Sequence, residues 1–328
     1  MLLPVSAINL NVYLGPLLGC VPWRHVFAAG WDFRRIRGTR SAPLKNTAIL
    51  LVQCPDRKGL SAAIADFIFQ HNGNILHVEQ HQAGDSTLSY LARTEFSLDG
   101  FALDVKDFPS RFAPIAERFS MQWRLAHGSY RPRVAIFVSK YDHCLVDLLY
   151  RQRNGELACE IAAIISNHLD AKRHADFYGI PYHAIPVTKE IKPAAEEQEL
   201  ELLRASQVDL IVLARYMQVL SSDFIRHYPQ QIINIHHSFL PAFIGAKPHH
   251  QAYERGVKLI GATAHYVTQV LDDGPIIEQG VARISHKDAL EDLVEKGRDL
   301  EKVVLSRAVR WHIESRILLY DNKTVIFE

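Results

Sequence analysis

Two polar segments in the second half of the chain hold the residue types that acid–base chemistry needs. One is Asn234-Ile235-His236-His237, directly after an apolar run, and the other is Leu271-Asp272-Asp273-Gly274-Pro275, a turn sequence. Side chains alternate along an extended segment, so Asn234 and His236 should face the same side. An amide and an imidazole can donate hydrogen bonds to a developing oxyanion, and the Asp272 carboxylate can act as a general base.

These two segments resemble the catalytic segments of the formyltransferase family that uses 10-formyltetrahydrofolate. The spacing also matches, since the aspartate follows the histidine by 36 positions (272 − 236). The resemblance implies that Asn234, His236 and Asp272 are catalytic. Asn234 and protonated His236 would stabilise the oxyanion, and Asp272 would orient and deprotonate the attacking group. Taken singly, each residue has a structural explanation, such as a strand end or a turn, so the prediction depends on the pair.

A third segment, residues 213–221 (LARYMQVLS), resembles the folate-binding loop of the same family. The resemblance implies that its backbone contacts the pterin ring. The substrate-binding residues expected on this basis are Met217, Gln218, Val219, Leu220, His265 and Thr268. The alternative is a plain strand-to-helix connection in which Met217 and Leu220 belong to the core.

Strands and helices alternate through this half of the chain. Apolar runs at 134–138, 161–166, 182–185, 210–214 and 232–235 predict strands, with helices about 145–150, 196–206, 223–228 and 289–317. Such an order predicts an α/β domain with a doubly wound, mostly parallel sheet. Ligands bind such sheets at the carboxyl ends of the strands, where the polar segments stand. The charges at 297–302 are expected to form a solvated helical face.

The preceding region has a different order. Strands at 48–53, 75–82, 87–98 and 121–126 and helices beginning at Leu60 and at 105–118 give βαββαβ, the ferredoxin-like arrangement, with a hairpin about Gly84-Asp85. The segments 56–60 and 72–75 resemble the ligand-binding turn and loop of ACT domains. The regulatory residues that this implies are Asp56, Gly59, Leu60, Asn74 and Ile75. The alternative is that Gly59 and Gly73 only permit tight turns.

These patterns divide the chain into four parts: a poorly ordered extension at 1–44, an ACT-like regulatory domain at 45–127, a linker at 128–132 and a formyltransferase-fold domain at 133–328. Deletion of 1–40 should leave an active enzyme, because that segment contains no catalytic or folate-loop residue.

The segment 139–149 (SKYDHCLVDLL) resembles the deformylases of this family, and so does 297–302. Glycinamide ribonucleotide formyltransferases carry a Gly-x-Gly-Ser-Asn phosphate loop where 139–149 stands. The resemblance therefore implies that water replaces the acceptor and that 10-formyltetrahydrofolate yields formate and tetrahydrofolate, which would supply formate for purine synthesis. The alternatives are formyl transfer to an amine and an inactive amino-acid-binding regulator. Two departures, Gln269 for an acid and His249 for an aromatic residue, could alter folate affinity.

Composition limits the partners. Lysine and arginine total 37 against 36 acidic residues, a net charge of +1, which favours neither nucleic acid nor a membrane surface. No apolar run reaches the roughly 20 residues of a membrane span. Four cysteines without C-x-x-C and 17 histidines without metal-ligand spacing predict no metal and no cofactor, and they suit a cytoplasmic protein. The family resemblance implies glycine or methionine as an effector and a homo-oligomer.

Overall fold

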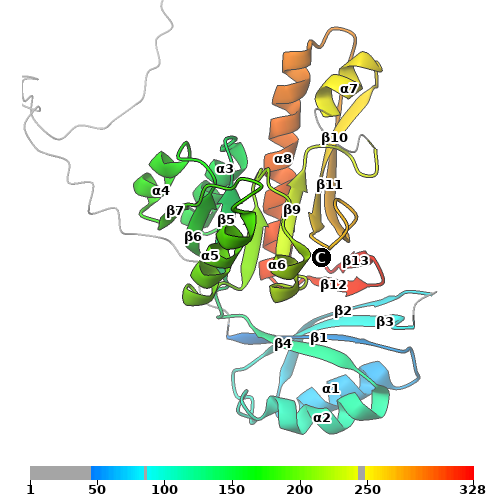
Figure 1. Ribbon diagram of the computed structural model, residues 1–328. Helices are drawn as coiled ribbons and strands as arrows, with labels where there is room; N and C mark the ends of the chain where they lie inside the picture. The colour runs from blue at the N-terminus through cyan, green and yellow to red at the C-terminus, as the bar shows by residue number, and fades with distance from the viewer. Residues whose placement is uncertain (1–45, 85–86, 243–247) are drawn as a thin grey trace, which may run out of the picture. The chain divides into compact units, whose positions relative to one another are not determined.

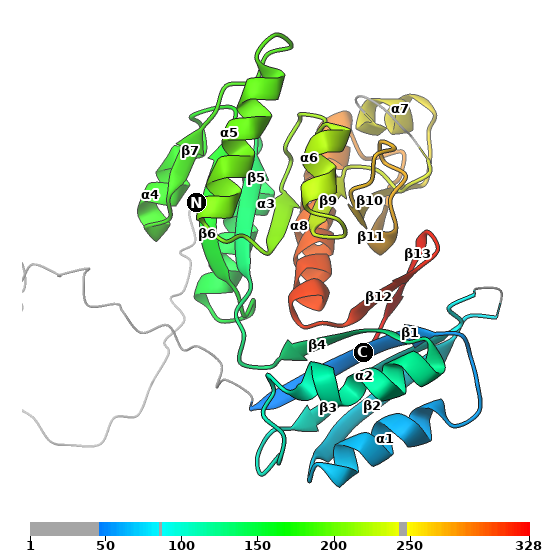
Figure 2. The ribbon, with the colours of Figure 1, turned by 60° about the horizontal axis from the view of Figure 1, so that its bottom comes forward.

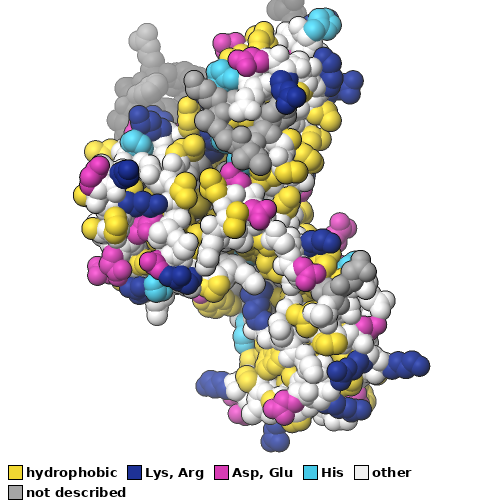
Figure 3. All heavy atoms as spheres, turned by 45° about the vertical axis from the view of Figure 1, so that its right-hand side comes forward, with side chains coloured by type: hydrophobic (Ala, Val, Ile, Leu, Met, Phe, Trp, Pro, Cys, Tyr) yellow, Lys and Arg dark blue, Asp and Glu magenta, His cyan; other side chains and the backbone are white. Residues whose placement is uncertain are grey.

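The computed structural model describes residues 46–84, 87–242 and 248–328. The predicted extension at 1–44 and Asp85 of the predicted hairpin lie outside the described residues. Figures 1 and 2 show the arrangement of the helices and strands. Within the described ranges, no helix has both the length and the apolar character that crossing a membrane requires. Figure 3 shows basic and acidic side chains intermingled over one face of the molecule, in agreement with the near-zero net charge.

The amino-terminal elements form the predicted ferredoxin-like unit. They are β1 (Thr47–Cys54), α1 (Leu60–Gln70), β2 (Asn74–Gln82), β3 (Tyr90–Ser97), α2 (Phe108–Phe119) and β4 (Gln122–His127). The four strands make an antiparallel sheet in the order β2-β3-β1-β4. Both helices cover one face of this sheet (Figure 2).

An aromatic core joins these helices to the sheet. Phe67 of α1 contacts Phe108 and Phe112 of α2 in edge-to-face arrangements, with ring centroids 5.2 Å apart in both pairs. The second helix begins three residues after the predicted start. Asp104 accepts a hydrogen bond from the backbone N–H of Lys106 at 2.9 Å, and this local bond holds the preceding segment in a turn.

The second sheet has seven strands in the order β11-β10-β9-β8-β5-β6-β7. Their bounds are β5 (Arg133–Val138), β6 (Glu160–Ser166), β7 (Tyr182–Ala184), β8 (Leu210–Leu213), β9 (Ile232–His236), β10 (Leu259–Tyr266) and β11 (Ile276–Arg283). The five neighbouring strands β9, β8, β5, β6 and β7 run parallel to one another. Strand β10 is antiparallel to both of its neighbours, β9 and β11. The strand order reverses between β5 and β8, which places a ligand crevice at their carboxyl ends.

Helices cover both faces of this sheet, which confirms the doubly wound prediction. They are α3 (His143–Arg153), α4 (Lys172–Tyr178), α5 (Lys192–Ala205), α6 (Ser222–His227), α7 (Pro248–Glu254) and α8 (Leu290–Ile313). Alternation along β5 sends Ile136 into a core with Leu145 of α3 and Leu305 of α8. The next residue, Phe137, packs on the opposite side with Phe224 of α6.

The carboxyl-terminal region differs from the prediction. The long helix ends at Ile313 rather than 317, since Ser315 adopts a left-handed φ of 52°. The chain then forms a hairpin of β12 (Ile317–Tyr320) and β13 (Lys323–Ile326). Sequence analysis also missed β11, α4 and α7. Elements of four to eight residues contain too few periods for reliable hydrophobic patterning.

This hairpin carries the last residues to the first sheet. Phe327 is buried in a small cluster with Leu51 and Leu91 of the antiparallel sheet. Arg93 on β3 donates through Nε to the backbone carbonyl of Ser315 at 3.2 Å. The chain end therefore contributes to packing at the ferredoxin-like sheet.

Candidate active site

The predicted catalytic residues come together at the carboxyl edge of the seven-stranded sheet. Asn234 and His236 occupy the end of β9, and Asp272 lies in the turn after β10. All three line a cavity of about 580 Å³. Asp272 adopts a left-handed φ of 56°, which turns the chain sharply and brings its carboxylate back toward β9.

The Asp272 carboxylate faces two imidazoles. Its Oδ2 lies 3.3 Å from Nδ1 of His236, and its Oδ1 lies 3.7 Å from Nε2 of His265. All three side chains are largely buried, with 12% or less of each exposed. Hydrogen bonds from His236 and then His265 outweigh the effect of burial and hold the pKa of Asp272 well below its ordinary value. Asp272 is therefore an anion at neutral pH, placed to orient the His236 imidazole and to accept a proton during a reaction.

His265 also connects Asp272 to Asn234. Because β10 runs antiparallel to β9, His265 pairs directly with Asn234. Its Nε2 lies 3.2 Å from Nδ2 of Asn234, and its Nδ1 lies 2.9 Å from the backbone oxygen of Tyr266. A carbonyl oxygen can only accept, so Nδ1 carries a proton. The other ring nitrogen, Nε2, faces both the Asn234 amide and the Asp272 carboxylate, so His265 links these two residues.

One atom of His236 stands out in this network. Its Nε2 is buried, and in the part of the chain that the structure describes it has no hydrogen-bond partner. The Asp272 carboxylate lies beside the other ring nitrogen, Nδ1, so a ring that carries protons on both nitrogens has an unpaired Nε2–H donor. A buried donor without a partner costs free energy in the free protein. Such a donor is suited to an oxygen that becomes negatively charged during reaction.

The predicted folate loop lines the same cavity. Met217, Gln218, Val219 and Leu220 all contribute, and so do His265 and Thr268. Met217 and Val219 are more than half exposed, whereas Leu220 is buried. The alternative that both Met217 and Leu220 belong to the core therefore holds for Leu220 but not for Met217. The backbone N–H of Met217 donates to Ser139 Oγ at 3.0 Å, which joins this loop to the end of β5.

A tyrosine and several charged and imidazole side chains form another part of the cavity wall, and sequence analysis had assigned them no individual role. They are Tyr141, His143, Arg215, His237, Arg298 and Glu301. The signals for them were the deformylase-like character of 139–149 and 297–302, the folate-loop segment that contains Arg215 and the polar segment that contains His237. The prediction of a solvated face at 297–302 is wrong for Glu301, whose side chain is 2% exposed. Helix α8 turns this carboxylate inward against the start of α3.

Glu301 is the centre of that part of the wall. Its Oε2 lies 2.8 Å from Nε2 of His143 and 3.4 Å from Nε of Arg215. Burial acts to raise the pKa of Glu301, but the His143 hydrogen bond and the Arg215 charge outweigh it and lower that pKa. Burial, together with the charge of Arg215, lowers the pKa of His237 to about 3. Glu301 is therefore charged and His237 neutral at physiological pH.

His249, which stands where the family often has an aromatic residue, also lines this cavity. A methyl group at Gly297 would approach His249 Nε2 to 2.5 Å, so a glycine on α8 makes room for the imidazole. The other departure, Gln269, lines the cavity beside Thr268.

The predicted effector residues are built differently. Gly59 has a φ of 92° and precedes α1, Leu60 is buried in the core, and Asp56 is exposed and accepts a hydrogen bond from Gln82. Asn74 and Ile75 begin β2. The tight-turn alternative holds for Gly59 through its φ. Effector binding by these residues stays a prediction.

The chain matches two family models: formyl transferase over residues 132–309 and ACT domain over residues 48–107. A formyltetrahydrofolate deformylase from Synechocystis is 56% identical over 281 residues, which cover 86% of this chain and 98% of the relative. The chain belongs to the formyltetrahydrofolate deformylase family. A crystal structure of a deformylase from Pseudomonas syringae pv. tomato has a TM-score of 0.85 and 46% identity, covering 90% of this chain and 97% of that one.

A solved transferase structure is also similar to the present chain, at lower identity. Glycinamide ribonucleotide transformylase 1 from Symbiobacterium toebii has a TM-score of 0.57 and 29% identity, and covers 60% of this chain. In the present chain, the segment after β5 contains Asp142, whose carboxylate forms ion pairs with His174 at 2.7 Å and Arg173 at 3.1 Å. This acid and Glu301 place negative charge around the start of α3.

Proposed function

We infer that this chain is a hydrolase that converts 10-formyltetrahydrofolate and water into formate and tetrahydrofolate. The observation that carries this inference is the unpaired, buried Nε2 of His236, on a ring held by Asp272 in a cavity that the folate-loop segment also lines. The curated relatives named formyltetrahydrofolate deformylase support it at 46–56% identity over most of the chain.

The proposed reaction uses the residues as follows. Water forms a bond to the formyl carbon and gives one proton to the Asp272 carboxylate, while the formyl oxygen becomes an oxyanion held by His236 Nε2–H and the Asn234 amide. The Asp272 carboxylate also holds the His236 imidazole in place and orients the attacking water. When the intermediate collapses, the bond between carbon and N10 breaks. A proton reaches N10 through His236 or a water, and formate leaves.

The folate is proposed to occupy the cavity with its pterin against Met217 to Leu220. Main-chain groups there would read the donors and acceptors of the ring, with His265 and Thr268 nearby. The hydrogen bond between Met217 N–H and Ser139 would hold this loop in place.

Regulation and assembly complete the proposal. The ACT match supports an amino-acid effector, and we propose glycine or methionine at Asp56, Gly59, Leu60, Asn74 and Ile75. A homo-oligomer, a cytoplasmic location and a role in supplying formate for purine synthesis are proposed on the family resemblance.

The test is to incubate pure protein with 10-formyltetrahydrofolate, with and without amine acceptors, and to measure formate and formylated amine. We expect formate release that does not depend on an acceptor. Formylation of an added amine without formate would instead support the transferase alternative. Folate binding without either product would support the inactive regulator.

A further inference from the structure

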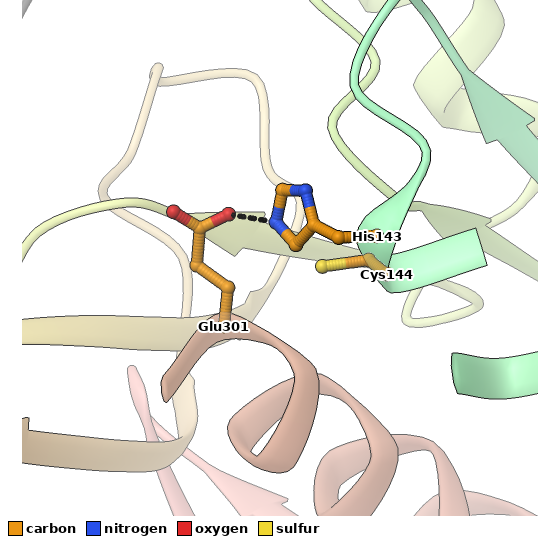
Figure 4. A group of neighbouring side chains, drawn as sticks. All are labelled: His143, Cys144 and Glu301. Carbon is orange, nitrogen blue, oxygen red and sulfur yellow. Dashed lines mark hydrogen bonds and ion pairs between the residues drawn. The ribbon is translucent and has the colours of Figure 1, made fainter. Parts of the chain in front are cut away.

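A second cluster of potential ligands lies in the cavity wall, apart from the catalytic trio. His143 and Cys144 are the first two residues of α3, and Glu301 projects from the middle of α8. One donor atom from each, the imidazole nitrogen, the thiol sulfur and a carboxylate oxygen, lies within 4.8 Å of the other two. Figure 4 shows the three side chains converging from these two helices, with the hydrogen bond between His143 and Glu301 drawn.

We propose that His143, Cys144 and Glu301 bind one divalent transition-metal ion of the zinc class. Imidazole, thiolate and carboxylate are the three ligand types that zinc takes in proteins, whereas magnesium and calcium favour oxygen alone. The mixed donor set therefore selects the class of ion.

The spacing of the donors suits a small ion after modest movement. Ligands about 2.0 to 2.3 Å from a tetrahedral zinc ion lie about 3.4 to 3.7 Å from one another. The donor atoms here lie within 4.8 Å of one another, and His143 Nε2 and Glu301 Oε2 are 2.8 Å apart, so the widest gap would close by about 1 Å while the His143–Glu301 pair opens by about half an ångström. Rotations of the Glu301 and His143 side chains can supply this movement.

The exposure of the three side chains indicates on which side of the metal ion a fourth ligand would bind. The side chain of Glu301 is 2% exposed and Cys144 is 1% exposed, while His143 is partly exposed. His143 and Glu301 line the cavity, but Cys144 is not among the lining residues. The protein thus encloses the thiol side and leaves the remaining coordination position toward the cavity, where water can bind. Three protein ligands and one open position are typical of zinc sites with reactive water.

Charge both favours and opposes the ion. The Glu301 carboxylate and a Cys144 thiolate would together neutralise a divalent cation; its binding releases the thiol proton to solvent, and the proton that His143 Nε2 now donates to Glu301 moves to Nδ1. Arg215 opposes it, since its Nε lies 3.4 Å from the same Glu301 oxygen that His143 contacts. Binding should therefore tighten as the pH rises and should loosen the Arg215 contact.

The test measures metal directly and needs no folate. The full chain, stripped with a chelator, is dialysed against Zn²⁺ and its metal content determined, and Co²⁺ is then substituted for its absorption spectrum. We expect one ion per chain and a thiolate-to-cobalt charge-transfer band. Glu301→Gln and His143→Gln should each weaken Zn²⁺ binding at least about tenfold. Cys144→Ser should abolish the band.

Matched variants control for the fold. Cys159 is also a buried free cysteine, and it lies outside the cluster, so Cys159→Ser should leave the metal content and the band unchanged. Circular dichroism reports whether each variant folds. Substoichiometric zinc in the folded, unmutated chain would overturn the proposal, as would a cobalt–thiolate band that survives Cys144→Ser. Formate release by metal-free protein would leave the proposed hydrolysis intact, so the two proposals fail separately.

Discussion

The formyl end of the cavity and the turn before α1 were both predicted to bind small ligands, and the chain builds them by different means. At the formyl end, side chains from β9, β10 and the following turn meet in a buried network around Asp272. At the turn, backbone conformation dominates, with a left-handed Gly59 and an exposed Asp56. A network of buried charges should respond strongly to one substitution, whereas an exposed turn should respond only when its ligand is present.

The largest expected effect is at Asp272. Asp272→Asn removes the carboxylate that holds His236 and assists the attacking water as general base, so formate release should fall by at least about a hundredfold. His236→Ala should be comparable, since it removes the oxyanion donor. Steady-state formate production by folded protein measures both. The matched control is the exposed neighbour, Asp273→Asn, which should retain activity. Undiminished turnover by folded Asp272→Asn would falsify the proposed role.

A smaller effect is expected at His265, which touches the network without carrying the oxyanion donor. His265→Gln should reduce turnover about tenfold by loosening Asn234 and Asp272. His265 helps to hold the pKa of Asp272 down, so its removal should raise that pKa and move the acid limb of the pH–rate profile to higher pH. A rate loss with an unmoved acid limb would mean that His265 acts through packing alone.

At the effector turn, Gly59→Val should leave basal formate release intact and abolish any response to glycine or methionine. Valine at a φ of 92° should destabilise the fold by about 1 to 2 kcal/mol. Gly179→Val is the control, because Gly179 also has a positive φ, of 71°, and open space around it. Titration of both amino acids against turnover measures the response. If the unmutated enzyme neither binds nor responds to them, the effector assignment fails.

The smallest effect concerns the support beneath the folate loop. Tyr216 donates to buried Glu199 at 2.9 Å, and burial raises the pKa of Glu199 to about 7. The folded protein therefore holds this proton more tightly than the unfolded chain, so stability falls as the pH rises from about 4.5 through 7. Glu199→Gln should flatten that decline by on the order of 1 kcal/mol, measured by denaturant titration at several pH values. An unchanged decline would place the titrating group elsewhere.

Much of the fold could be predicted because its signals are local. Apolar runs marked the strands of the parallel sheet, and three- and four-residue spacing marked α1. The short carboxyl-terminal strands could not be predicted this way, since β12 and β13 each span four residues. Their positions depend on the turn at Ser315 and on contacts of Phe327 with a sheet more than 200 positions earlier.

By itself, the sequence determined the type and order of the main elements, because strand alternation and turn chemistry act over a few residues, and its resemblance to the formyltransferase segments selected Asn234, His236 and Asp272. Only the tertiary structure decided which groups surround them. Antiparallel pairing of β10 with β9 places His265 between Asn234 and Asp272, and packing of α8 against α3 brings Glu301 to His143 across 158 positions. Contacts between residues so far apart leave no trace in local periodicity, since they form only when whole elements pack together.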